Sequence, residues 1–201
     1  MKKLLFCLVV FATGCEDQSA KNESNQLTFI SNEGNFGSSN GSVSVFRSGK
    51  LIQEVKDIGD VVQSILVHNE KLFVLVNNSH MIKVYQINDD GLELPGISIS
   101  TEGSSPREMV VENNKLYFTN YNSQDVKVLN LSTYYIENSI QLNGLPESIV
   151  SDETNLWVAI NMNADYSSAS SVVKIEIESG KVIKTFEVGK GPQQLLVDGN
   201  N

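Results

Sequence analysis

The chain is poor in the residues that build several kinds of functional site. It has two cysteines, two histidines, one tryptophan and four prolines among 201 residues. Cys7 lies inside an apolar run near the N-terminus, so Cys15 is the one cysteine beyond that run. A disulfide framework and a cysteine-ligated metal site are therefore excluded as organising features of the chain.

Motifs of common catalytic and nucleotide-binding sites are also missing. His68 and His80 are the two histidines, and neither belongs to a metal-ligand spacing such as HExxH. No serine stands in a GxSxG motif, and no glycine-rich phosphate loop follows a predicted strand. We therefore expect a protein that binds rather than catalyses, with no cofactor. Convergence of Asp60, Glu108 and Glu147 would instead permit a hydrolase or a metal-dependent, lactonase-like site.

Positive charge is scarce as well. Fifteen Lys and Arg residues face 24 Asp and Glu residues, which gives a formal net charge of −9 at pH 7. Loss of residues 1–14 would remove two lysines and make the net charge −11. Such an acidic surface repels phosphate backbones, so nucleic acid is not an expected partner.

Residues 1–14 are predicted to be an export signal rather than part of the fold. Two lysines precede the apolar residues 4–11, a stretch too short to span a bilayer as a helix. Ala12-Thr13-Gly14 then leads into Cys15, which resembles the lipobox of bacterial lipoproteins, although Ala12 stands where Leu is commonest. The resemblance implies a lipid on Cys15. An ordinary secretory peptide cleaved nearby is the alternative.

Residues 15–26 are predicted to join this anchor to a folded domain. The segment EDQSAKNESNQ after Cys15 contains no large apolar side chain, which is typical of a solvated tether. Glu16 and Asp17 resemble the acidic signal that sends lipoproteins of Bacteroidota to the outer face of the outer membrane. A generic polar spacer is the alternative. The outer membrane, facing the cell surface, is thus the expected location, and the periplasmic face is the second.

After the tether, one segment recurs four times. It reads LTFISNEGN, KLFVLVNNS, KLYFTNYNS and NLWVAINMN. Aligned on Leu27, Leu72, Leu116 and Leu156, the copies lie 45, 44 and 40 residues apart, the spacing of a four-stranded propeller blade. No convincing helical periodicity follows the N-terminal signal. Residues 27–201 therefore predict an all-β fold, a β-propeller with about four blades, at approximately 27–67, 68–111, 112–151 and 152–201.

The fourth element of each copy predicts the innermost strand of a blade. These elements read VVQSILV, SPREMVV, LPESIVS and GPQQLLV. Proline opens three of them, at a strand start where a missing N–H is tolerated. Two polar residues come next in every copy, and they would meet at one mouth of a central channel lined by inner strands. The pairs are Gln63/Ser64, Arg107/Glu108, Glu147/Ser148 and Gln193/Gln194.

The recurring segment is expected to be the second strand of a blade. The turn that follows it, between the second and third strands, is predicted to lie at the same mouth. The alignment gives Asn32, Asn77 and Asn161 equivalent positions, with Tyr121 in the third copy. Amide and aromatic groups suit a polar ligand with flat apolar surface. Turn chemistry alone also favours Asn, Gly and Ser, so a structural role is the alternative. The candidate ligand-binding residues are Asn35, Phe36, Asn77, His80, Arg107, Asn120, Tyr121, Asn161 and Gln193.

Residues 114–150 resemble the YVTN-type β-propeller repeat. Its hallmark is an aromatic-rich second strand that ends in Thr-Asn, here Tyr117-Phe118-Thr119-Asn120. Residues 32–46 and 59–85 are similar to YncE-like propeller lipoproteins of Bacteroidota, a group that includes cell-surface cobalamin-capturing proteins working beside TonB-dependent transporters. The resemblance implies capture of a ligand, such as a corrinoid, and its delivery to a transporter. A protein-interaction platform is the alternative function.

Propellers of that family have seven blades, whereas this chain has material for four. A four-bladed ring would close if residues 193–197 completed the blade that begins at Leu27, at the lower limit for this architecture. The favoured alternative is that the chain is a truncated product or fragment. An open array of blades would expose a blade face and an unpaired strand edge.

Overall fold

The computed structural model describes residues 26–198 of the chain. The predicted export signal, Cys15 and nearly all of the tether lie outside these described residues. Within residues 26–198, the secondary structure consists of β-strands and turns. No helix in this part of the chain is long and apolar enough to cross a membrane.

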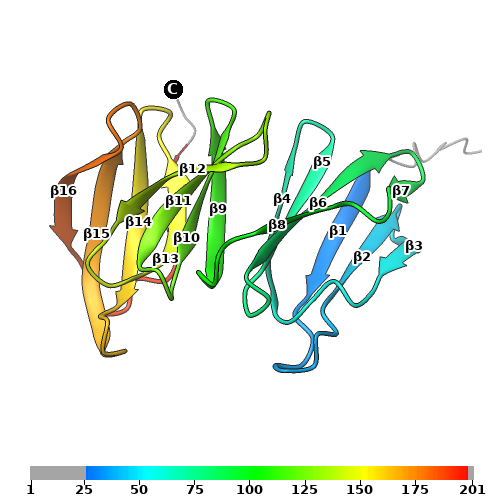
Figure 1. Cartoon of the computed structure of the whole chain (residues 1–201), viewed down its shortest axis with the longest axis horizontal. Helices are drawn as coiled ribbons and strands as arrows, with labels where there is room; N and C mark the ends of the chain where they lie inside the picture. The colour runs from blue at the N-terminus through cyan, green and yellow to red at the C-terminus, as the bar shows by residue number, and fades with distance from the viewer. Residues whose placement is uncertain (1–25, 199–201) are drawn as a thin grey trace, which may run out of the picture.

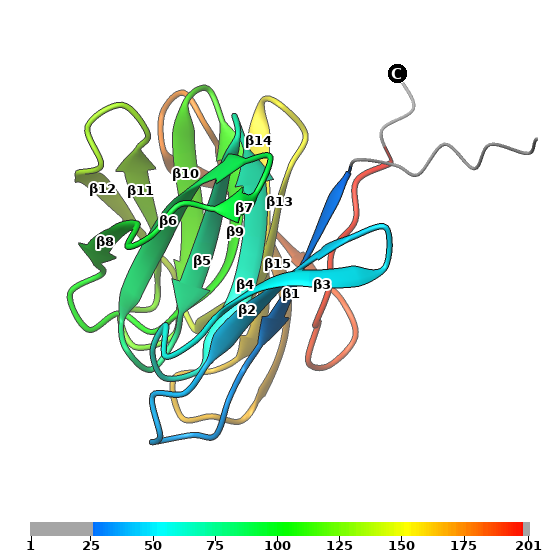
Figure 2. The same cartoon turned by 90° about the vertical axis from the view of Figure 1, so that its right-hand side faces the viewer.

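The strands form antiparallel sheets that stand side by side as four blades (Figures 1 and 2). Blade 1 contains β1 (Leu27–Asn32), β2 (Ser42–Arg47) and β3 (Lys50–Val55). Blade 2 contains β4 (Val62–His68), β5 (Lys71–Val76), β6 (Met81–Asn88) and β8 (Ile97–Ser100), and β7 (Gly91–Leu92) pairs with the end of β6. Blade 3 contains β9 (Pro106–Glu112), β10 (Lys115–Asn120), β11 (Asp125–Asn130) and β12 (Ile136–Gln141). Blade 4 contains β13 (Leu145–Ser151), β14 (Asn155–Met162), β15 (Ser168–Glu176) and β16 (Lys181–Glu187).

The sheets are displaced by one strand from the predicted blade bounds. Each inner strand pairs with the strand that follows it, as β4 does with β5 and β9 with β10. A short turn joins each such pair, whereas residues 56–61 cross from one sheet to the next. The bounds 27–67, 68–111, 112–151 and 152–201 therefore follow the sequence repeat correctly but assign each inner strand to the wrong sheet.

The hydrophobic core lies between neighbouring sheets. Between blades 2 and 3, Phe73 and Leu75 of β5 pack with Leu116 and Phe118 of β10. Two equivalent clusters join blade 1 to blade 2 and blade 3 to blade 4. Alternate residues of each central strand face opposite neighbours, so strands such as β5 are apolar on both faces. This packing explains why the repeats carry long apolar runs.

The alignment of the first copy is wrong by one residue. Leu27 and Phe29 pack against blade 2, as Phe73 and Leu75 pack against blade 3. Asn32 pairs with Ser42 at the turn of blade 1, as Val76 pairs with Met81 at the turn of blade 2. Counting back from these pairs makes Phe29 equivalent to Phe73, and Thr28 rather than Leu27 equivalent to Leu72. A shift of one residue exchanges the two faces of a strand, so Asn32 is not equivalent to Asn77.

The described residues form an open arc rather than a closed four-bladed ring. β1 pairs with β2 on one side and has no inner strand on the other. Residues 192–198 form no strand, although they carry the fourth copy of the inner-strand pattern. Figure 1 shows blade 1 and blade 4 at opposite ends of the row of sheets.

We predict that the interblade core dominates stability. Replacing the fully buried Phe118 with Ala removes an aromatic ring from the contact between blades 2 and 3 and should lower the free energy of unfolding by about 3–5 kcal/mol. Urea denaturation measures this change. Val67 is 55% exposed, so Val67→Ala is the control and should cost less than about 0.5 kcal/mol. Equal effects of the two substitutions would contradict this view of the core.

Candidate functional site

The inner strands β4, β9 and β13 of blades 2, 3 and 4 lie next to one another. Their first residues lie on the same side of the row of blades, and this side is the mouth. Val61 and Ser105 precede β4 and β9 with positive φ angles of 61° and 56°. The backbone N–H of Asn77 donates to the Val61 carbonyl, and that of Tyr121 donates to the Ser105 carbonyl. The turns after β5 and β10 are thereby hydrogen-bonded to the starts of β4 and β9, the inner strands of the same blades. The predicted mouth is therefore confirmed as a place where these two kinds of segment meet.

Arg107 is the centre of a polar network at this mouth. Its guanidinium forms a two-pronged ion pair with Glu147, with Nη2–Oε1 and Nε–Oε2 distances of 2.7 and 3.1 Å. Its Nη1 also donates to Gln63 Oε1 at 2.9 Å. The Glu147 side chain is 6% exposed and that of Arg107 is 22% exposed. Two-pronged Arg–carboxylate pairs fix orientation as well as charge, so these three side chains are held in one geometry.

Tyr121 extends the network toward blade 4. Its hydroxyl donates to Glu147, and its ring lies under the Arg107 guanidinium, 4.5 Å from the Cζ atom to the ring centroid. Asn161 Oδ1 lies 3.4 Å from the Tyr121 hydroxyl, and Asn161 Nδ2 donates to Gln193 Oε1 at 3.0 Å. Burial raises the pKa of Tyr121 well above its ordinary value, and the hydrogen bond to Glu147 raises it further. The phenol therefore stays a hydrogen-bond donor at neutral pH.

A cavity of about 410 Å³ opens beside this network. Its polar lining includes Gln63, Arg107, Glu147 and Gln193, which occupy the same position in successive copies. The second residues of three polar pairs also line it: Glu108, Ser148 and Gln194. The polar-pair prediction thus located the lining of a cavity that spans the starts of three inner strands and the segment after β16.

Glu108 is the titratable group of this cavity with the clearest perturbation. Burial raises its pKa above the ordinary value, a hydrogen bond with Ser64 lowers it, and the negative charge of Glu147 raises it. Arg107 offsets part of this increase. Two carboxyl groups, Glu108 and Glu147, and one guanidinium, Arg107, line the cavity, so negative charge is in excess there.

The predicted residues Asn77 and Asn161 act as clamps between blades. Asn77 Nδ2 donates at 2.9 Å to the carbonyl of Pro106, which opens the next inner strand. Asn161 Nδ2 lies 3.5 Å from the equivalent carbonyl of Pro192. His80 Nδ1 accepts from the backbone N–H of Ser105 at 3.1 Å, so it also holds the start of an inner strand.

Asn120 does not reach the mouth, which corrects its inclusion among the candidate ligand-binding residues. Its side chain is fully buried. It accepts from Ser104 Oγ at 2.6 Å and donates to the Phe118 carbonyl and to Asp125 Oδ1 at 3.1 and 2.9 Å. Side chains along a strand point alternately to its two faces. At the end of β10 this alternation directs the Asn120 side chain toward Ser104 and Asp125 rather than toward the mouth.

Asn35 and Phe36 lie apart from the polar network, on the exposed loop between β1 and β2. Phe36 is 79% exposed. Asp60 holds this loop, because both of its carboxylate oxygens accept from the Gly37 N–H at 3.0 Å and one accepts from Asn78 Nδ2 at 2.5 Å. Asp60 is therefore a loop clamp and does not line the cavity with Glu108 and Glu147. Within residues 26–198, no group of three His, Cys, Asp or Glu residues is arranged to hold a metal ion.

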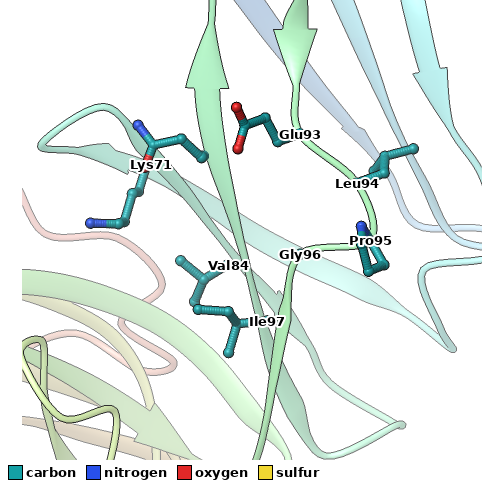
Figure 3. A pocket seen from close by; sticks show the side chains of 8 residues that line it. Lys71, Val84, Glu93, Leu94, Pro95, Gly96 and Ile97 are labelled. Carbon is teal, nitrogen blue, oxygen red and sulfur yellow. The ribbon is translucent and has the colours of Figure 1, made fainter.

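Another pocket, of about 270 Å³, lies at the other end of β5 from the mouth. Figure 3 shows Lys71 and Glu93 at one side of it and Val84 and Ile97 at the other. Leu94, Pro95 and Gly96 of the segment before β8 complete its wall. No set of polar groups converges there as it does around Arg107, so the mouth is the stronger candidate site.

Comparison with solved structures confirms the propeller architecture. The chain is similar to a protein proposed to be a 6-phosphogluconolactonase from Bacteroides fragilis NCTC 9343, with a TM-score of 0.65 and 15% identity over 84% of this chain and 55% of that one. It is also similar to the WD40 β-propeller domain of Doa1, with a TM-score of 0.57 and 12% identity over 74% of this chain and 50% of that one. Hydrazine synthase of Kuenenia stuttgartiensis matches with a TM-score of 0.62 and 18% identity over 73% of this chain and 43% of that one.

The fold is a β-propeller. At such low identities the likeness concerns the fold alone, and the three proteins differ in function. No protein-family model matches the chain, and no curated protein matches it. The chain spans about half the length of the three solved structures, from 43% to 55%.

We predict that Arg107→Ala is destabilising because it leaves the buried Glu147 carboxylate without its cation. The free energy of unfolding should fall by about 3 kcal/mol, the lower end of the range for breaking a buried ion pair, since Arg107 is 22% exposed. The double variant Arg107→Ala/Glu147→Gln removes the stranded charge and should recover part of the loss. Urea denaturation of the single and double variants tests this. An Arg107→Ala protein as stable as the parent would show that the pair is solvated.

We predict that Glu108→Gln raises stability at pH 7. The folded protein holds the Glu108 proton to higher pH than the unfolded chain, because burial raises the folded-state pKa. Stabilisation from this group is therefore lost as pH rises through that pKa. The advantage of the glutamine variant should shrink as pH falls through the raised pKa of Glu108 and should be lost below the ordinary pKa of Glu. Denaturation curves across this pH range measure the difference, with the exposed Glu153→Gln as control. A pH-independent difference would contradict the prediction.

Proposed function

We propose that the protein binds a polar ligand at the mouth and does not transform it. The observation that carries this proposal is the continuous chain of contacts from Gln63 through Arg107, Glu147, Tyr121 and Asn161, beside a cavity of about 410 Å³. These side chains are already held by hydrogen bonds and an ion pair to one another, so they form a rigid wall. Little side-chain entropy is therefore lost when a ligand binds. Exposed groups at the edge of that wall then make the new contacts.

The groups free to contact a ligand are amides and one carboxyl group. The Gln194 side chain lines the cavity and makes no hydrogen bond within the described part of the chain. The Nε2 group of Gln63 is a donor, since its Oε1 is occupied by Arg107. Glu108 adds an acceptor with excess negative charge. This set favours a neutral or cationic ligand with several hydrogen-bond donors and acceptors, and it disfavours a strongly anionic one.

A corrinoid meets these requirements, because its peripheral amides both donate and accept hydrogen bonds. We therefore propose a corrinoid or another nutrient with such groups as the ligand. The resemblance to YncE-like lipoproteins supports a cell-surface protein, anchored to the outer membrane through Cys15, that hands its ligand to a TonB-dependent transporter. A propeller hydrolase or lactonase is the less supported alternative, because Asp60 does not join Glu108 and Glu147 at the cavity.

Binding is tested by titrating the purified protein with cyanocobalamin and following thermal stabilisation and ligand turnover. A ligand that binds the folded state stabilises it by RT ln(1 + [L]/Kd), so the melting temperature rises with the logarithm of the ligand concentration once that concentration exceeds Kd. We predict saturable stabilisation without chemical change of the corrinoid. Gln63→Ala together with Gln194→Ala should weaken binding at least tenfold. The free protein should lose about 1 kcal/mol of stability, because Gln63 accepts a hydrogen bond from Arg107, and should remain folded. Gln141→Ala, on the exposed outer strand β12, is the matched control and should bind normally. Hydrolysis of an added lactone, abolished by a chelator, would contradict a purely binding role.

A protein-interaction platform is favoured by a different observation. Phe36 and Tyr166 are 79% and 72% exposed on the long loops after β1 and β14. Both loops lie at the lower edge of the arc in Figure 1, and hydrogen bonds within each loop hold them in place. Pull-down from solubilised outer membranes tests this role. Loss of a captured transporter on changing both aromatics to Ala, with corrinoid binding retained, would assign the loops to partner binding.

A further inference from the structure

Blade 2 has the longest connection between outer strands among the four described blades. Residues 48–49 join β2 to β3, residues 131–135 join β11 to β12, and residues 177–180 join β15 to β16. In blade 2, residues 89–96 lie between β6 and β8 and include β7. Insertions in a repeat lie in loops, and such loops often form binding surfaces. The pocket of about 270 Å³ is built on this insertion.

The insertion is held firmly at its middle. Leu92 is 4% exposed and packs in the core between blades 1 and 2. Its backbone N–H donates to Gln53 Oε1 at 2.7 Å, and its carbonyl accepts from Gln53 Nε2 at 2.9 Å. The backbone N–H of Glu93 donates to the Gln86 carbonyl at 2.9 Å. Residues 93–97 therefore start from a fixed point, and the pocket is formed before a ligand arrives.

Gly96 allows the end of the insertion to pass close to β6. Its φ angle is +74°, and a Cβ atom there would lie 2.5 Å from the Tyr85 ring and 2.8 Å from the Val84 carbonyl oxygen. Any residue other than glycine would push the segment away from β6. The close approach of this segment to Val84 therefore depends on Gly96.

The pocket has a charged side and an apolar side. Figure 3 shows Lys71 and Glu93 at the charged side and Val84 and Ile97 at the apolar side. Val84 is 2% exposed and Ile97 is 44% exposed, so the apolar side has a buried floor and an accessible edge. Pro95 adds further apolar surface. A molecule that fits this pocket has one charged end and one apolar end.

The charged side offers groups that bind little else. In the described part of the chain, neither Lys71 nor Glu93 forms an ion pair. Glu93 Oε1 has one long contact, 3.4 Å from Asn88 Nδ2. Gln86 Nε2 donates to the Glu70 carbonyl at 3.0 Å, which leaves Gln86 Oε1 as an acceptor. A cation, an anion and a neutral acceptor thus lie at one side of the pocket.

The size of the pocket and its two charges restrict the ligand further. Ligand pockets commonly have volumes of about 300–1,000 Å³, so this one suits a molecule smaller than a drug-sized ligand and has no room for a corrinoid. An apolar amine would leave Lys71 unpaired, and a fatty acid would leave Glu93 unpaired. A molecule with an ammonium group and a carboxylate on one carbon, next to an apolar side chain, satisfies both.

We propose that this pocket binds a free α-amino acid with a branched aliphatic side chain, such as leucine. The α-carboxylate pairs with Lys71, whose flexible stem lets its ammonium group turn toward the ligand. Glu93 and Gln86 Oε1 accept hydrogen bonds from the α-ammonium group. The aliphatic side chain packs against Val84 and Ile97. This site lies at the other end of β5 from the mouth, and it is independent of the ligand proposed there.

NMR titration of the isotope-labelled protein with L-leucine tests the site and the ligand together. The backbone amide shifts should saturate and should centre on residues 93–97, Lys71 and Gln86. Glycine lacks the aliphatic side chain, isoamylamine lacks the carboxylate, and isocaproate lacks the ammonium group. Each should bind at least about tenfold more weakly than leucine, because each loses a contact with a charged group or an apolar contact.

Two variants separate the roles of the two charges. Lys71→Gln should weaken leucine binding about tenfold or more and should no longer distinguish leucine from isoamylamine. Glu93→Gln should no longer distinguish leucine from isocaproate. Both variants should stay folded, since neither side chain is paired within residues 26–198. Glu153→Gln, at an exposed residue outside the pocket, is the matched control and should bind leucine normally.

Three results would each overturn the proposal. The first is an absence of amide shifts at millimolar leucine. The second is a set of shifts centred on Gln63 and Gln194, which would assign leucine to the mouth. The third is discrimination among leucine, isoamylamine and isocaproate that is unchanged in both Lys71→Gln and Glu93→Gln, which would show that the two charges do not contact the ligand.

Discussion

The packing of apolar sheet faces against one another is the constraint on which the rest of the structure depends. Each central strand buries both faces, one against the preceding blade and one against the next, as Leu72 and Phe73 of β5 illustrate. Burial of such side chains is the main source of stability in a fold without disulfides. It also fixes the spacing and tilt of the blades, and thereby brings the starts of β4, β9 and β13 together.

The polar site is a consequence of that arrangement. Gln63, Arg107 and Glu147 stand at one position of successive repeats, so packing the blades brings them within hydrogen-bond distance. The buried Arg107–Glu147 pair costs desolvation energy, and its two-pronged geometry together with the Tyr121 hydroxyl offsets that cost. The molecule thus maintains a charged, rigid wall beside the cavity, and ligand contacts are left to less constrained amides such as Gln194.

Much of the fold could be predicted because the repeat is strong: the proline and the polar pair mark each inner strand, and strands such as β5 have a clear apolar pattern. The errors arose where a strand has weak periodicity or where burial depends on a neighbouring blade. The repeat alignment misplaces Leu27 by one residue because Thr28 interrupts the apolar run of the first copy. Asn120 looks like a turn residue in sequence, yet Ser104 and Asp125 from other segments bury it. The network around Arg107 could be located by repeat position, but its pairing could not, since Gln63 and Glu147 are both plausible partners for an arginine.

The central claim is that the mouth is rigid and charge-paired before any ligand arrives. Arg107 is one of two arginines in the chain, so NMR hydrogen exchange at its Nε–H in the ligand-free protein is a direct measurement. The account predicts slow exchange for Arg107, because Nε donates to the buried Glu147 carboxylate. Exchange as fast as that of a free arginine would mean that the ion pair is solvated, and would contradict the account.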